Sequence, residues 1–411
     1  MKRTVALVLI FVLLCGCRFI SLDNESDSAP EYKTLTVEDS VVKADVYPET
    51  DKFQTVGLFE RTQFGYLTDA QKSIYITLDN AAYEMTTGYI DVGVCSVRDL
   101  SIAYYAMRKD RPEYFWLPTA YSLKDTGGQI AVRFAETESD WICTREERIS
   151  AEGEIKAVLN EYLGTLSGEE SVFELELKAH DFLCKSIEYD NDALKHTTGD
   201  HVAWTVYGAF IDGKAVCEGY AKAMQIMCFM QGINCGVVTG VTTSAHMWNY
   251  VEIDNGWYFV DVTANDVSDK GYHSFFNVTD DYISASYTID PDVENVSDEE
   301  LKSGQFNFNV PSCSKLDYNY FVQNGRYIMN TEQVEETIIS EVCRAVNEGR
   351  NSVEFCVDPK LSFVYGRNEL GDLVDLEKCI KNANSDLPKD KRLKSYNYSG
   401  ISGALGFMIS W

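Results

Sequence analysis

Three residues in the middle of this chain have the side chains that nucleophilic catalysis requires: Cys217, His246 and Asp261. A cysteine thiolate can attack a carbonyl carbon, a histidine can accept and return the proton, and an aspartate can hold the imidazole in the correct orientation. The three side chains, if the fold brings them together, would therefore catalyse acyl transfer through a thioester.

The segment around Cys217 predicts a helix that begins at the cysteine. Cys217 follows a Gly213-Lys214 turn and opens an apolar run with the spacing of a buried helix face. At a helix N-terminus, unpaired amides and the positive end of the helix dipole stabilise a thiolate. The apolar positions of this run are Tyr220, Ala221, Met224, Met227 and Cys228.

His246 and Asp261 lie on two short segments that are rich in aromatic and β-branched residues. Asp254-Asn255-Gly256 separates the segments, which predicts a β-hairpin with an Asn-Gly turn. The base and the residue that orients it would then lie on neighbouring strands, facing the helix.

Taken singly, each of the three residues has a commoner structural role. A cysteine in an apolar helix is often a small core residue, and an aspartate at a strand end is often a cap. The catalytic interpretation rests on all three occurring together in settings that suit their chemistry.

The surrounding motifs resemble the core of the transglutaminase-like superfamily of papain-like thiol enzymes, over about residues 170 to 280. The motifs are V-C-x-G-Y-A at Cys217, H-x-W-N-x-V at His246 and W-x-x-x-D-x-T at Asp261. The resemblance implies an α+β fold, in which a helix bearing the cysteine packs on an antiparallel sheet. Smaller α+β domains are expected on both sides of this core.

An oxyanion needs two hydrogen-bond donors. The backbone amide of Cys217 is the natural first donor. Related bacterial sequences resemble the stretch around Tyr207, which implies Tyr207 as the second, with Trp204 and His201 as alternatives.

The first seventeen residues predict export. Lys2 and Arg3 precede an apolar stretch that is too short to span a membrane as a stable helix. The end of this stretch resembles a bacterial lipobox. We therefore expect lipidation at Cys17 and anchoring to the outer face of the cell membrane, with plain secretion as the alternative. The net charge of −28 argues against nucleic-acid binding.

The remaining chain divides by composition. We expect the His180-Asp181 pair, like His273, to be structural, and the aromatic run 112–117 to be core. Residues 201–211 predict a helix, and residues 272–276 and 318–322 predict strands. The predicted divisions are a signal peptide (1–17), a tether (18–54), an accessory domain (55–145), the catalytic core (146–280), a linker or surface excursion (281–312) and a C-terminal α+β domain (313–411), which would serve recognition, assembly or stabilisation.

The predicted activity is attack on peptide or carboxamide bonds. Water would resolve the thioester in a protease or amidase, and an amine would resolve it in a cross-linking enzyme; the resemblance favours hydrolysis. An exported enzyme would meet surface proteins or cell-wall peptides. The mechanism requires no metal or cofactor, and the cysteines show no zinc spacing. The alternative function is a catalytically silent scaffold or binding module.

Overall fold

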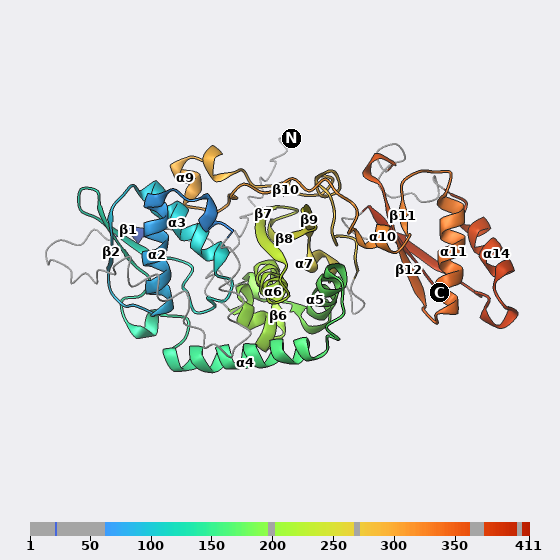
Figure 1. The fold of residues 1–411 in the computed structure, drawn as a ribbon, viewed down its shortest axis with the longest axis horizontal. Coiled ribbons are helices and arrows are strands. Elements are labelled where there is room, and N and C mark those ends of the chain that lie inside the picture. The colour runs from blue at the N-terminus through green and yellow to red at the C-terminus, as the bar shows by residue number, and fades with distance from the viewer. Residues whose placement is uncertain (1–20, 23–61, 196–201, 267–271, 362–373, 401–404) are drawn as a thin grey trace, which may run out of the picture.

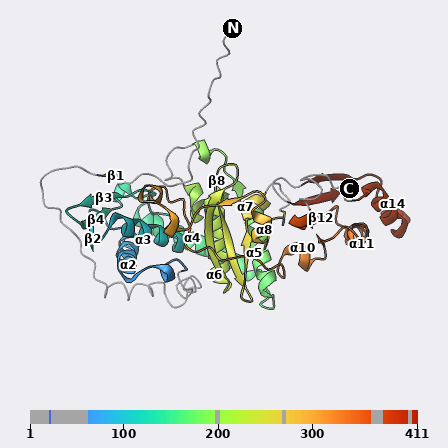
Figure 2. The same cartoon turned by 90° about the horizontal axis from the view of Figure 1, so that it is seen from above.

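The computed structural model describes residues 21–22, 62–195, 202–266, 272–361, 374–400 and 405–411. Three units follow one another along the longest axis of the molecule (Figure 1), and the view from above places them in the same order (Figure 2). The predicted signal peptide lies outside the described residues. Within those residues, no helix combines the length and the apolar character needed to cross a membrane.

The N-terminal unit is a sheet with the strand order β1-β3-β4-β2, packed with two helices. Ser21 and Leu22, in the stretch expected to be a tether, pair in parallel with Ser122 and Leu123. The aromatic run is buried, as predicted, and Trp116 is fully inaccessible. The elements are β1 (Ser21–Leu22), α2 (Asp69–Tyr83), β2 (Ile90–Val94), α3 (Val97–Asp110), β3 (Ser122–Asp125) and β4 (Gln129–Arg133).

The middle unit contains the expected α+β core. Its sheet has the strand order β10-β7-β8-β9, in which β10 is Thr288–Ile289, with antiparallel pairing throughout. Helix α6 packs against β8 and β7, and Asn249 of β8 donates a hydrogen bond to the carbonyl oxygen of Ala221 in α6 over 2.9 Å. The elements are α4 (Arg145–Gly164), α5 (Val172–Ser186), β5 (Glu188–Tyr189), β6 (Lys214–Ala215), α6 (Cys217–Met230), β7 (Asn234–Val241), β8 (Ala245–Ile253), β9 (Gly256–Val260) and α7 (Val262–Asn265).

The β8–β9 hairpin forms as predicted, although its turn is one residue earlier than an Asn-Gly turn. Asp254 and Asn255 have φ values of 47° and 57°, and Gly256 already pairs with Ile253. Two consecutive residues with positive φ are typical of the turn whose twist matches that of the strands.

Of two predicted elements of the middle unit, the helix at 201–211 is interrupted and the strand at 272–276 is wrong. The described part of the first segment forms a 3₁₀ turn (Val202–Trp204) and then a short π-helix (Gly208–Asp212) in place of one continuous helix. The chain folds back tightly here: a Cβ on Gly208 would lie 2.6 Å from the carbonyl oxygen of Val202. Residues 272–276 form a turn, because the side chain of Asn265 accepts a hydrogen bond from the Phe275 amide over 2.9 Å.

The segment 281–312, expected to be a linker or surface excursion, contributes to the sheet and to the core. Thr288 and Ile289 form β10 and pair with β7. Phe306 and Phe308 are buried in the large hydrophobic core that continues from the N-terminal unit to α6. The short helices here are α8 (Asp280–Ile283) and α9 (Asp298–Leu301).

The C-terminal unit is a sheet with the order β11-β12-β14-β13, covered by two helices on its own hydrophobic core. The strand predicted at 318–322 is instead a short helix, because the Asn319 side chain accepts the Phe321 and Val322 amides. The elements are α10 (Tyr320–Gln323), β11 (Tyr327–Ile328), α11 (Val334–Asn347), β12 (Ser352–Val357), α14 (Leu376–Asp386), β13 (Asn397–Gly400) and β14 (Gly406–Ser410).

Candidate active site

Cys217 is the first residue of α6, in the position that the sequence predicts. The loop before the helix packs against it closely. A Cβ on Gly219 would lie 2.6 Å from the Ala203 carbonyl oxygen and 2.8 Å from the Ala215 side chain. Glycine at this position therefore allows the first turn of α6 to approach the loop, which fixes where the cysteine lies.

The structure brings the three predicted catalytic residues together. His246 lies on β8. Asp261 is the residue directly after β9, the neighbouring strand. Nε2 of His246 is 2.6 Å from Oδ2 of Asp261. Because Nε2 is engaged with the carboxylate, Nδ1 is the ring nitrogen left for the Cys217 sulfur, with which His246 also forms a hydrogen bond.

The electrostatics of the pair favour an imidazolium ion. Burial opposes a charge on His246, but the Asp261 carboxylate and Cys217 outweigh it and raise the pKa of His246 well above its ordinary value. Burial likewise opposes ionisation of Asp261, yet His246 and further hydrogen-bond donors lower the pKa of its carboxyl group. A charged imidazole beside a thiol at a helix N-terminus is a setting that stabilises a thiolate.

The Asp261 carboxylate is fixed by more than the histidine. Its Oδ1 accepts the Ala264 amide over 3.0 Å, so Asp261 is also the N-cap of α7. Its Oδ2 accepts the hydroxyl of Tyr287 over 2.7 Å. Tyr287 was missed from the sequence, since nothing in its acidic surroundings points to Asp261.

The site is closed to solvent on most sides. Cys217 is only 2% exposed, whereas the His246 side chain is 12% exposed. The buried ring of Trp248 stacks on His246 with 5.8 Å between centroids, as expected of a residue that excludes water.

The structure describes two of the predicted side-chain donors to an oxyanion, Tyr207 and Trp204. The ring of Tyr207 contacts Phe115, with 5.6 Å between centroids, and burial together with Asp212 raises its pKa. Neither neighbour is a member of the triad, so the role of Tyr207 stays a prediction. Trp204 is buried and packs with Val216, the residue before the nucleophile. His201 and the lipidation residue Cys17 lie outside the described residues.

One cluster in the part of the chain that the structure describes has donor atoms close enough to hold a metal ion: His180, Asp181 and His273. The Asn265 amide nitrogen faces Nε2 of His180 at 2.9 Å, because the amide oxygen already accepts the Phe275 amide. His180 must then carry its proton on Nδ1 and donate it to Asp181 over 2.9 Å. The lone pair that a metal would need is absent from Nδ1, so the contacts favour a structural network.

The other nine cysteines that the structure describes are also free thiols. Burial raises the pKa of Cys95 and of Cys143 to about 11. Burial also raises the pKa of Cys184, a buried residue of α5. The described cysteines thus provide internal comparisons for the reactivity of Cys217.

Comparison with known proteins identifies the middle unit. Residues 161–262 match the family model of the transglutaminase-like superfamily. The chain is 30% identical to kyphoscoliosis peptidase of Mus musculus over 123 residues, which are 26% of this chain and 18% of that protein. The chain therefore spans less than a fifth of the length of this curated relative.

Two solved structures are also similar over part of the chain. One is described as a TGase; it shares 16% identity, with 36% of this chain and 44% of that chain covered and a TM-score of 0.26. The other is described as a candidate cysteine protease from Cytophaga hutchinsonii; it shares 18% identity, with 28% and 37% covered and a TM-score of 0.22. By its sequence match and its α+β fold, the middle of this chain is a transglutaminase-like domain.

Proposed function

We propose that this protein is a thiol hydrolase that cleaves peptide or carboxamide bonds through a thioester on Cys217. The observation that carries the proposal is the contact between Nε2 of His246 and Oδ2 of Asp261 at 2.6 Å, in a histidine that also bonds to the helix-terminal cysteine. The similarity to a protein named as a peptidase supports hydrolysis over cross-linking.

The geometry supports the following mechanism. The Cys217 thiolate attacks the carbonyl carbon, and the backbone amide of Cys217 donates to the developing oxyanion. His246 gives its proton to the leaving amine as the C–N bond breaks, which leaves a thioester and a neutral imidazole. His246 then takes a proton from water, the hydroxide attacks the thioester, and the released thiolate is again paired with an imidazolium. Asp261 orients the ring throughout.

The pH dependence of alkylation tests this proposal. We expect iodoacetamide to modify Cys217 well below pH 8.5, near which a free thiol ionises. Peptide mapping by mass spectrometry would compare Cys217 with the nine other described thiols, and His246→Ala is the control that should abolish the early reaction. An ordinary thiol profile at Cys217, unchanged by His246→Ala, would exclude the enzyme.

The second candidate is a silent scaffold, which the 2% exposure of Cys217 favours. The same measurement separates the two candidates, because a scaffold has no need of a reactive thiolate.

We further propose that lipidation at Cys17 holds the enzyme on the outer face of the cell membrane, where surface proteins or cell-wall peptides would be its substrates. The support is the charged, apolar and small-residue order of the first seventeen residues. Cys17→Ser should move the protein from the membrane fraction to the soluble fraction, and unchanged fractionation would contradict the anchor.

A further inference from the structure

A buried lysine of the N-terminal unit contacts a buried asparagine of the segment after β10. Nζ of Lys109, in the last turn of α3, donates to Oδ1 of Asn307 over 3.2 Å, although the two residues are 198 positions apart. They are 7% and 1% exposed. A primary amine and a carboxamide can condense into an amide bond, so the chemistry open to this contact goes beyond a hydrogen bond.

The backbone on both sides of the contact is held in place. The carbonyl oxygen of Lys109 accepts Nε2 of Gln225 in α6 over 3.1 Å. The backbone amide of Asn307 donates to Pro291 over 2.9 Å, and the Asn307 carbonyl oxygen accepts the Val293 amide over 2.8 Å. The fold therefore keeps the amine and the amide together, and groups that are held in contact react far faster than free ones.

The side-chain amide of Asn307 is polarised for attack. Its Oδ1 also accepts the backbone amide of Thr239 over 2.9 Å and the Thr239 hydroxyl over 3.3 Å. Donors aimed at a carbonyl oxygen stabilise the negative charge that develops there when a nucleophile adds to the carbon. Nδ2 donates to the carbonyl oxygens of Thr239 and Asp290, over 2.9 Å and 3.0 Å, so the orientation of the amide is fixed.

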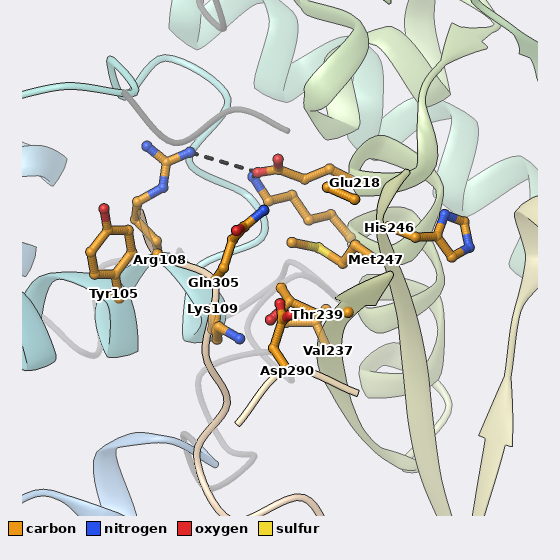
Figure 3. Close-up of a pocket in the computed structure, with 14 residues that line it drawn as sticks. Tyr105, Arg108, Lys109, Glu218, Val237, Thr239, His246, Met247, Asp290 and Gln305 are labelled. Atoms are coloured by element: carbon orange, nitrogen blue, oxygen red, sulfur yellow. Dashed lines mark ion pairs between the residues drawn. The ribbon is translucent and has the colours of Figure 1, made fainter. Parts of the chain in front are cut away.

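Asp290 supplies a carboxyl group that can carry protons between the two nitrogens. In Figure 3 the amine of Lys109 points toward the side chains of Thr239 and Asp290. The charge of Lys109 favours the ionised Asp290, but burial outweighs it and raises the pKa of this carboxyl group. A raised pKa brings a carboxyl group closer to the operating pH, where it both accepts and donates protons.

Aromatic side chains surround the contact. Phe306 and Phe308, on either side of Asn307, are buried. The ring of Tyr105 meets that of Phe306 edge to face, with 5.3 Å between centroids. These rings exclude the water that would otherwise compete with the amine for the amide carbon.

We propose that Lys109 and Asn307 become joined by an isopeptide bond. Asp290 takes a proton from the Lys109 ammonium group, and the neutral amine attacks Cγ of Asn307. In the tetrahedral intermediate, Asp290 gives its proton to Nδ2 and accepts one from Nζ. The Cγ–Nδ2 bond then breaks, and the ammonia that leaves takes up the proton from Asp290. The products are a secondary amide and an ammonium ion, so the reaction needs no oxidant or reductant.

The bond closes a ring of chain that contains Cys217, His246 and Asp261, because all three lie between positions 109 and 307. It ties α3 of the N-terminal unit to the segment that supplies β10 of the catalytic sheet. A cross-link of this kind restricts the unfolded chain as a disulfide does, without depending on the redox state of the surroundings. The inference is independent of the proposed hydrolase activity.

The test is the intact mass of the full chain with Cys217→Ala, a background that excludes acyl transfer by the thiol. The folded protein is purified, denatured and weighed by mass spectrometry, and its mass is compared with that calculated from its sequence. We expect the loss of one ammonia molecule. Peptide mapping should then give a branched peptide that joins Lys109 to Asn307.

Variants in the same background locate the reaction. Lys109→Arg, which lacks the attacking amine, and Asp290→Asn, which lacks the proton carrier, should both have the full calculated mass and unfold at a lower temperature. The matched control is Lys391→Arg, since Nζ of Lys391 contacts Oδ1 of Asn347 over 3.4 Å on the exposed surface of the C-terminal unit. This variant should keep the loss of ammonia.

A folded parent chain with its full calculated mass and no branched peptide would overturn the bond. A loss of ammonia that persists in Lys109→Arg would also overturn it, because another residue must then be its source. Equal formation of the bond in Asp290→Asn would refute the proton transfer. Alkylation of Cys217 decides the proposed function separately, so the two failures are distinguishable.

Discussion

The hydroxyl of Tyr287 donates a hydrogen bond to Oδ2 of Asp261 over 2.7 Å. The oxygen that it contacts is the one that pairs with His246, so the tyrosine stabilises the carboxylate in its charged form. The contact joins a segment outside the matched family region to the proposed catalytic triad.

Removing this hydroxyl should change the acid limb of the pH profile. Tyr287 lowers the pKa of Asp261, so in Tyr287→Phe the carboxyl group should protonate at a higher pH, and reactivity should fall sooner as pH decreases. The rate at neutral pH should drop about tenfold, since hydrogen bonds to charged groups contribute ~1.5–3 kcal/mol. Alkylation of Cys217 across pH measures both effects. Tyr282→Phe, a buried tyrosine of the same segment, is the control, and identical limbs in the two variants would contradict a positioning role.

Asp261→Asn should change the alkaline limb. The carboxylate raises the pKa of His246, so its removal should shift the loss of the imidazolium, and with it the loss of the reactive pair, to lower pH. Peptide cleavage should fall roughly 10²–10⁴-fold, the range of general acid–base catalysis. The thiol itself remains in place. A variant with the wild-type alkaline limb would show that Asp261 is only the cap of α7.

His273 lies where the C-terminal unit contacts the core, and its ionisation should make the free energy of unfolding depend on pH. Burial opposes its charge, but a hydrogen bond to Asp181 over 2.9 Å and the nearby Glu354 carboxylate, 3.7 Å from Nδ1, raise its pKa to about 10. A raised pKa means that the stabilisation is complete below the unfolded value of ~6.5 and is lost as pH rises towards 10. His273→Gln should remove this decline in thermal unfolding scans between those values. Parallel curves for the variant and its parent would disprove the linkage.

Glu176 is the opposite case: it is a buried acid whose neutral form is favoured in the folded state. Burial raises its pKa to about 8, and its Oε2 accepts the Asn277 amide over 2.6 Å. The folded state then binds more protons than the unfolded state between pH ~4.3 and 8, so stability falls as pH rises through that interval. Glu176→Gln should be more stable than its parent at pH 8 and nearly equal at pH 4. Denaturant unfolding at the two values measures the difference, and a variant that is weaker at pH 8 would refute the assignment.

The triad could be predicted because each member lies in a segment with strong local signals. Cys217 opens a helix whose apolar spacing is clear in the sequence, and the turn at Asp254 and Asn255 brings the two strands together, so short-range patterns were sufficient. Tyr287 gives no such signal, since its partner is distant in sequence. The wrong strand at 272–276 has a similar origin: the side chain of Asn265 binds the Phe275 amide, and no local pattern predicts that competition.

The positions at the two edges of the catalytic sheet restrict how a polypeptide substrate can be held. On one side of the sheet, β7 is paired at Gly240 and Val241 with the two-residue edge strand β10, and on the other side the edge strand β9 is bridged at Phe259 by Val278. Many peptide-binding proteins add their ligand as an extra strand at an open sheet edge, where main-chain hydrogen bonds supply most of the affinity. At these positions the backbone groups are already used. A peptide therefore cannot add as a strand at these positions, and recognition of the proposed substrate there would come from side chains.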